Sequence, residues 1–240
     1  MPISRRTALS LAVALLATTA QAQGWPAKPI RLIVPFPAGG GTDLIARDLA
    51  NKLSTQGYNF VVENKPGSGG GVGVDAVAKA QPDGYAFVMG QTSNLAINPS
   101  LYAKLPYEPT KDLTPIGLVA SSPLVIVTGA SSPYKTLAEV IQASKAKPAS
   151  INYASSGNGT VAHLTAESLQ KVAGIQLTHI PYKGAAQGAT DVISGQVQLY
   201  MSSVPTLLGH IKSGKMRPLA VTSPQRVNDL PQVPTVAELG

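Results

Sequence analysis

Two loops built from glycine and small hydroxyl residues have the composition of anion-binding sites. The first reads PFPAGGGTD over residues 35–43 and follows an apolar run. The second reads SSGNGT over residues 155–160 and also stands between an apolar run and a helical pattern. Such loops present backbone N–H groups, and the N-terminus of the following helix adds a partial positive charge. Both loops are therefore candidates to bind a negatively charged group.

Two familiar kinds of glycine loop do not fit the sequence. A phosphate-binding loop needs a lysine after its last glycine, but Gly41 is followed by Thr42 and Asp43, and a carboxylate repels phosphate. The segment GVGVDA at 71–76 has the G-x-G-x-x-A spacing of a dinucleotide turn. No acidic residue ends the next predicted strand, where ribose recognition would require one. We therefore reject nucleotide binding at both places.

Several side chains beside these loops have two possible roles. Asp43 stands in the first helical turn, where it either caps the helix or accepts hydrogen bonds from a ligand or bound water. His163 follows the second loop and either touches a ligand or only satisfies its neighbours. Tyr182 and Lys183 follow a predicted strand and either line a cleft or remain in solvent. These alternatives stay open on the residues alone.

The sequence shows no catalytic or metal-binding pattern. The histidines at 163, 179 and 210 lack metal-ligand spacing, and we interpret His179 and His210 as structural. There is no G-x-S-x-G nucleophile motif, and the chain has no cysteine for thiol chemistry, disulfides or metal binding. We expect no metal, no cofactor and no enzymatic activity.

The N-terminus and the overall charge limit where the protein works and what it binds. Arg5 and Arg6 precede a short apolar stretch, and Ala20-Gln21-Ala22 matches a signal-peptidase site. We expect a signal peptide over residues 1–22, cleavage near Ala22 and export to the periplasm. The net charge of +7 is spread without a basic run, so we expect no nucleic-acid partner.

Alternating strand and helix patterns position the two loops. Strands at 30–34, 60–63 and 85–90 alternate with helices, which predicts a βαβαβ unit with a parallel sheet. In the helix predicted from about Asp43 to Gln56, apolar residues repeat at Ile45, Leu49 and Leu53.

A second α/β unit begins near residue 125. Thr136 and Glu139 form a predicted capping box at the start of one helix, and Gly174 is expected to end the next. We divide the mature chain into lobe 1 at 23–125 and lobe 2 at 126–240, with a hinge near 120–126. The two glycine loops would then face one another across a cleft and form a two-sided anion clamp.

The order of motifs along the mature chain resembles the Bug family. The matching segments are WPAKPIRLIVPFPAGGGTD, VVENKPGSGGGVG, AQPDGYAF, NYASSGNGT with a histidine after it, IPYKG, and RPLAVTS followed by LPQVPTVAELG. The family consists of TctC-like substrate-binding receptors of tripartite tricarboxylate transporters. The resemblance implies a two-lobed, type II-like periplasmic-binding-protein fold that closes on a small carboxylate, such as a citrate-like acid, an acidic amino acid or an aromatic acid.

The resemblance also implies a ligand site between the lobes, partly through ordered water. It places the first lobe's contacts at Phe36 to Asp43 and in TSN at 92–94, and the second lobe's at Ser155 to Thr160 with His163 behind them. The ligand-binding residues that we predict are Phe36, Ala38, Gly39, Gly40, Thr42, Asp43, Thr92, Ser93, Ser155, Gly157, Asn158, Gly159, Thr160, His163, Tyr182, Lys183 and Ser202.

The chain departs from the family pattern in two places. Members commonly carry an acidic or amide pair where this chain has Ser202-Ser203, a position that often faces the ligand. The family also continues beyond PTVAELG to complete the first lobe, whereas this sequence ends at Gly240. We therefore expect the C-terminal part of lobe 1 to be missing.

The leading hypothesis is a monomeric receptor that captures a small carboxylate and delivers it to the membrane permease subunits of a tripartite tricarboxylate transporter. A sensor that docks onto a membrane kinase would use the same pocket. An exported enzyme acting on a carboxylated substrate, with Asp43 or His163 as the base, is the other alternative.

Overall fold

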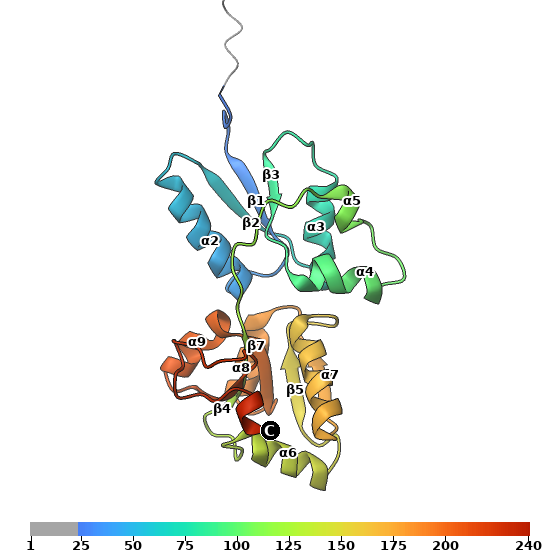
Figure 1. Ribbon diagram of the computed structural model, residues 1–240, viewed down its shortest axis with the longest axis vertical. Coiled ribbons are helices and arrows are strands. Elements are labelled where there is room, and N and C mark those ends of the chain that lie inside the picture. The colour runs from blue at the N-terminus through green and yellow to red at the C-terminus, as the bar shows by residue number, and fades with distance from the viewer. Residues whose placement is uncertain (1–23) are drawn as a thin grey trace, which may run out of the picture.

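The protein folds into two α/β lobes arranged end to end (Figure 1). The structure is a computed structural model that describes residues 24–240, so the predicted signal peptide lies outside the described residues. Residues 113–123 form no helix or strand and lead from the first lobe into the second. None of the helices within residues 24–240 has the length and apolar character needed to cross a membrane.

Lobe 1 contains the βαβαβ unit that the sequence predicts. Strands β1 (Ile30–Val34), β2 (Phe60–Asn64) and β3 (Ala86–Val88) form a parallel sheet in the order β2-β1-β3. Helices α2 (Gly41–Ser54) and α3 (Gly71–Ala78) make the crossovers. Parallel strands require such crossovers, which explains the alternating pattern in the sequence.

Helix α2 packs through a different face from the one that its large apolar residues suggested. Ala46 and Ala50 are buried, whereas Ile45, Leu49 and Leu53 are only partly covered. Small side chains let the helix backbone lie close to the sheet, so the alanine side makes the closest contact. The larger residues fill the margins of the core.

The rest of lobe 1 is a series of short helical turns. The proline-rich region forms α4 (Asn98–Leu101) and α5 (Pro109–Asp112), and a π-helical turn, η2 (Ser93–Ile97), precedes them. A 3-10 turn, η1 (Ser68–Gly70), precedes α3. Asn94 and Asn98 are fully buried in this region, and the Asn98 amide donates to the carbonyl of Gly69.

Lobe 2 has a mixed sheet of five strands. In sequence order these are β4 (Leu124–Gly129), β5 (Asn152–Ser155), β6 (Thr178–Pro181), β7 (Leu199–Ser203) and β8 (Met216–Val221), and in space β6-β5-β7-β4-β8. Strand β5 is parallel to β6 and β7, whereas β4 is antiparallel to both β7 and β8. Because β4 follows directly from the connecting segment, it enters the lobe in the opposite direction to β5 and β7.

Helices cover both faces of this sheet. They are α6 (Leu137–Ala146), α7 (Val161–Ala173), α8 (Ala185–Ile193) and α9 (Val204–Lys212), and a last turn, η3 (Ala237–Leu239), lies near the C-terminus. Alternate residues of β4 enter different cores: Val125 packs with Leu207 of α9, and Ile126 with Leu137 of α6. The period of two in a buried strand accounts for this division.

Two local predictions about helix ends are confirmed. The Thr136 side chain accepts from the backbone N–H of Glu139, and the Glu139 carboxylate accepts from the backbone N–H of Thr136. Gly174 ends α7 in the left-handed conformation, with φ 63° and ψ 43°. Helix α2 begins at Gly41, two residues before the predicted start.

Candidate functional site

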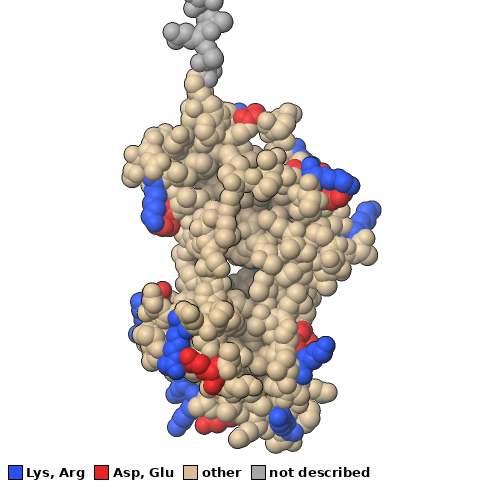
Figure 2. Space-filling model, viewed as in Figure 1, with Lys and Arg blue, Asp and Glu red and all other residues tan. Residues whose placement is uncertain are grey.

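A cavity of about 100 Å³ lies between the two lobes. In Figure 2 the surface is hollowed between the lobes, and the charged side chains visible on that face lie away from the hollow. The cavity wall contains glycines, small hydroxyl residues and a few apolar groups, and none of its residues is charged. The lining residues are Phe36, Pro37, Gly40, Gly41, Thr42, Gln91, Ser93, Leu124, Ser156, Thr160, Val161, Ala162, Gly184, Ala185, Ser202, Ser203 and Thr206.

Four helix N-termini meet at this cavity. Helices α2, α7, α8 and α9 all contribute residues of their N-cap or first turn to its wall. Among the four N-cap residues only Thr160 of α7 makes a side-chain cap, whereas Gly40, Gly184 and Ser203 make none. The first N–H of α2, on Gly41, bonds instead to the Thr206 hydroxyl of lobe 2. Uncapped helix N-termini present backbone donors and partial positive charge, so the cavity favours an anion without using arginine or lysine.

The two lobes touch across this cavity. The backbone N–H of Gly41 donates to Thr206 Oγ1 at 2.9 Å, and the N–H of Val161 donates to Ser93 Oγ at 3.3 Å. Gly184 of lobe 2 also lies against the ring of Pro37 in lobe 1. The structure therefore shows the lobes in a closed arrangement.

Part of the sequence-predicted set lines the cavity. Phe36, Gly40, Thr42, Ser93, Thr160 and Ser202 do so. The remaining predicted residues are not among the lining residues; they are Ala38, Gly39, Asp43, Thr92, Ser155, Gly157, Asn158, Gly159, His163, Tyr182 and Lys183.

Three further lining residues, Pro37, Gly41 and Ser156, lie inside the two loop ranges that the family resemblance implies, and Ser203 belongs to the Ser202-Ser203 pair. The other lining residues are outside the predicted set, and most of them belong to the N-cap or first turn of a helix; they are Gln91, Leu124, Val161, Ala162, Gly184, Ala185 and Thr206. One usable signal was the proline after Val204, because proline is common in the first turn of a helix and therefore indicates that α9 begins there. Side chains facing the cavity from lobe 2 otherwise carry no charge or motif that would identify them.

Asp43 holds the first loop from behind and does not line the cavity. Its carboxylate accepts from the Gly39 N–H at 2.9 Å, from Arg47 Nε at 3.0 Å and from Asn64 Nδ2 at 2.9 Å. Burial alone would raise the pKa of Asp43, but the hydrogen bonds from Arg47, Gly39 and Asn64 outweigh it and lower the pKa below 3.8. Asn64 also donates to the Phe36 carbonyl. Asp43 therefore fixes the shape of the loop.

We expect Asp43→Asn to reduce the free energy of unfolding at pH 7 by about 1.5–3 kcal/mol, because it replaces a charged acceptor of three hydrogen bonds. The lowered pKa of Asp43 stabilises the fold above pH 3.8, and this contribution is lost as the pH falls through the lowered value. The stability difference between wild type and variant should consequently shrink in strong acid. Urea unfolding at pH 7 and below pH 3.8 measures this.

Asp48→Asn is the matched control for that experiment. Asp48 lies on the same helix and pairs with Lys52, but both side chains are more than half exposed. Its removal should change stability little, because exposed ion pairs contribute about 0–1 kcal/mol. An equal loss in the two variants would contradict the role assigned to Asp43.

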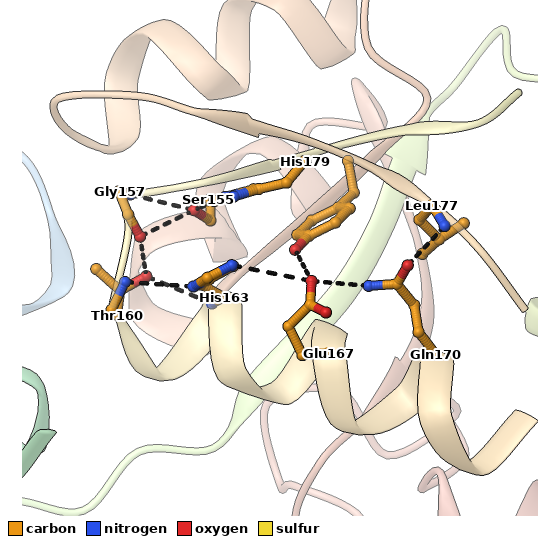
Figure 3. Close-up of polar contacts among 10 residues, drawn as sticks. Ser155, Gly157, Thr160, His163, Glu167, Gln170, Leu177 and His179 are labelled. Atoms are coloured by element: carbon orange, nitrogen blue, oxygen red, sulfur yellow. Dashed lines mark hydrogen bonds and ion pairs between the residues drawn. The ribbon is translucent and has the colours of Figure 1, made fainter. Parts of the chain in front are cut away.

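A network of rings and polar groups lies behind the second loop (Figure 3). Tyr153, His179 and His163 stack in that order, with ring centroids 4.8 Å and 4.2 Å apart. His163 Nδ1 accepts from the Gly159 N–H at 3.3 Å, and His179 Nε2 lies 2.6 Å from Ser155 Oγ. Burial and the His163 ring lower the pKa of His179 to about 4, against the attraction of Glu167. The prediction that His179 is structural fits this geometry, and His163 belongs to the same stack.

The two residues proposed after β6 are not among those that line the cavity. The Tyr182 hydroxyl donates to Asp191 Oδ2 at 2.5 Å, and burial together with this contact raises the pKa of Tyr182 to about 12. Lys183 is exposed. Within residues 24–240 no three metal-ligating side chains are grouped closely enough to hold a metal ion.

Comparisons with known proteins identify the family of this chain. Residues 45–240 match the TctC family, described as tripartite tricarboxylate transporter family receptors. The chain is 40% identical to BugT of Bordetella pertussis over 96% of its own length and 71% of that protein.

Solved structures give the same result. The periplasmic binding protein BugD is 39% identical with a TM-score of 0.83, over 90% of this chain and 72% of BugD. Rpa4515 of R. palustris, solved with adipate, is 35% identical with a TM-score of 0.87, over 90% and 73% of the two chains. MatC of Rhodopseudomonas palustris, solved with bound malate, is 28% identical with a TM-score of 0.82, over 90% and 74%. The chain therefore belongs to the TctC family of tripartite tricarboxylate transporter receptors, as its resemblance to the Bug proteins predicted.

Proposed function

We propose that the interlobe cavity binds a small dicarboxylate, which the protein delivers to the permease subunits of a tripartite tricarboxylate transporter. The observation that carries the proposal is the meeting of four helix N-termini at an uncharged cavity. Each N-terminus is equivalent to about half a positive charge, so four of them together balance about two negative charges. A dicarboxylate supplies that charge.

The volume of the cavity supports the same class of ligand. A water molecule occupies roughly 10–15 Å³ of such a volume, so about 100 Å³ accommodates roughly seven to ten non-hydrogen atoms. Malate and adipate are of this size. MatC and Rpa4515 were solved with these two acids, which makes them the first compounds to test.

A thermal-shift screen followed by calorimetry tests the proposal. Adipate is compared with hexanoate, which has the same chain length and one carboxylate, and malate is compared with its monoamide. A dicarboxylate at a hundred times its Kd should stabilise the protein by about 2.7 kcal/mol, and the monocarboxylate should give a smaller shift. Equal binding of adipate and hexanoate would contradict the charge argument.

The protein's site of action and its partners form the second part of the proposal. We infer a monomeric periplasmic receptor whose signal peptide is removed near Ala22, because the N-terminal pattern and the family agree. N-terminal sequencing and mass measurement of the exported chain test these points.

Ligand uptake that requires both this chain and the permease subunits would support transport, whereas capture by a membrane kinase would favour the sensor alternative. The enzyme alternative is excluded, because the family consists of solute-binding receptors.

A further inference from the structure

The stacked rings of lobe 2 contact the cavity-lining loop at both of its ends. His179 Nε2 lies 2.6 Å from Ser155 Oγ at the start of the loop, and Ser155 Oγ accepts from the Gly157 N–H at 3.1 Å. His163 Nδ1 accepts from the Gly159 N–H near the end of the loop. Ser156 and Thr160, between and beside these contacts, line the cavity. The two histidines therefore support the loop from behind, together with the hydrogen bonds from Ser155 and Thr160 to the Gly157 carbonyl (Figure 3).

The contact to Gly159 requires a neutral His163. Because Nδ1 accepts a hydrogen bond, the ring proton is on Nε2, which faces Glu167 Oε1 at 3.8 Å. A second proton can enter His163 only at Nδ1. That proton would face the N–H of Gly159, so the two donors would oppose each other and the hydrogen bond would be lost.

The titratable groups that face His163 come from α7, β5 and β6. Glu167 of α7 makes the only ion-pair contact to the stack within residues 24–240. Its Oε1 also accepts from the Tyr153 hydroxyl of β5 and from Gln170, both at 2.9 Å, which holds the carboxylate in place. His179 of β6 opposes a charge on His163 through the stacked ring. A proton added to His163 would therefore be attracted by Glu167 but would remove the hydrogen bond from Gly159.

We propose that the His163–His179 stack positions the ligand-binding loop and that ligand affinity falls when His163 takes up a proton. The proposal rests on the carboxylate-binding function argued above. A neutral histidine ring can accept a hydrogen bond at one nitrogen, whereas a doubly protonated ring can only donate. His163 is a positioning residue in this scheme, since it does not line the cavity.

The test combines a ligand-free and a ligand-bound measurement on the mature chain. In the free protein, the amide resonance of Gly159 is followed by NMR from pH 7.5 to pH 5.5. In parallel, adipate affinity is measured by calorimetry at both pH values, with malate as the second probe. Loss of one hydrogen bond predicts an affinity decrease of about three- to tenfold.

Variants of His163 separate the effect of protonating the histidine from the effect of protonating the ligand. His163→Asn keeps an acceptor near the position of Nδ1 but does not titrate, so its affinity ratio between the two pH values should contain only the ligand's contribution. His163→Leu removes the acceptor and should bind more weakly than His163→Asn at pH 7.5. His210→Asn, on α9, should behave as wild type in both measurements.

The outcomes are distinct. A Gly159 resonance that titrates in wild type and not in His163→Asn, together with the extra affinity loss in wild type, supports the proposal. A resonance that does not titrate, or an affinity ratio that is the same in wild type and His163→Asn, overturns it. If Gly159 titrates as expected but neither acid binds at pH 7.5, the proposed carboxylate function fails and the role of the stack in shaping the loop stands.

Discussion

Gly184→Ala should weaken ligand binding by about ten- to hundredfold while leaving the fold intact. A Cβ at this position would lie 2.6 Å from Cγ and 3.1 Å from Cβ of Pro37, across the cleft. The proline ring cannot rotate away, and overpacking of this kind costs about 1–3 kcal/mol, which corresponds to the expected loss of affinity. Gly184 has φ 176° and ψ 178°, an extended conformation open to any residue, so the cost arises only when the lobes close.

Calorimetry and solution scattering, with and without ligand, check this prediction. The variant should show less ligand-dependent compaction than wild type. Gly209→Ala, in α9 of the same lobe, is the control because a Cβ there meets no atom within 4 Å. Combining Gly184→Ala with Pro37→Ala should recover part of the affinity, since the shortest contact is removed. Unchanged affinity in Gly184→Ala would show that ligand binding does not require the closed arrangement seen here.

Gly159→Ala should lose stability and also lose affinity by at least about tenfold, and these two losses have separate causes. Gly159 has φ +72°, so any other residue adds roughly 1–2 kcal/mol of backbone strain. A Cβ there would also collide with Leu101 Cδ2 of lobe 1. The strain lowers stability in any arrangement of the lobes, whereas the collision acts only against closure.

Gly174→Ala separates these two effects. Gly174 lies at the other end of α7 with φ +63°, and a Cβ there meets nothing within 4 Å. Both variants should lose similar stability in urea unfolding, and only Gly159→Ala should lose affinity. Leu101 is 47% exposed, so Leu101→Ala is tolerable and should restore binding to Gly159→Ala. Equal affinity losses at Gly159 and Gly174 would assign the effect to strain alone.

The sequence predicted local structure well because local structure depends on nearby residues. The parallel sheet of lobe 1 follows from alternating strands and helices, and the capping box at Thr136 from two residues three apart. The antiparallel placement of β4 was not predicted. The direction of β4 depends on how the chain passes from one lobe to the other. The sequence pattern within β4 carries no information about that connection.

The cavity was predicted less completely for a similar reason. The sequence identified the glycine loops, but Asp43 was included among the ligand contacts because its partner Asn64 of β2 meets it only in the folded lobe. Thr206 and Gly184 reach the cavity only when the lobes come together. Residues that contribute only backbone groups to a binding site are difficult to identify from the amino-acid sequence, because almost any residue type can supply those groups.

The proposed recognition of negative charge by main-chain groups has a consequence for how such receptors diversify. Every amino acid except proline carries the same backbone N–H, so most substitutions around this cavity change its size and shape without deleting its anion-binding donors. Side chains such as Ser156 and Ser202 can therefore vary from one descendant gene to another while the backbone donors are retained. A scaffold of this kind can acquire a new nutrient through a few point mutations, because the attraction for acidic compounds is inherited with the fold.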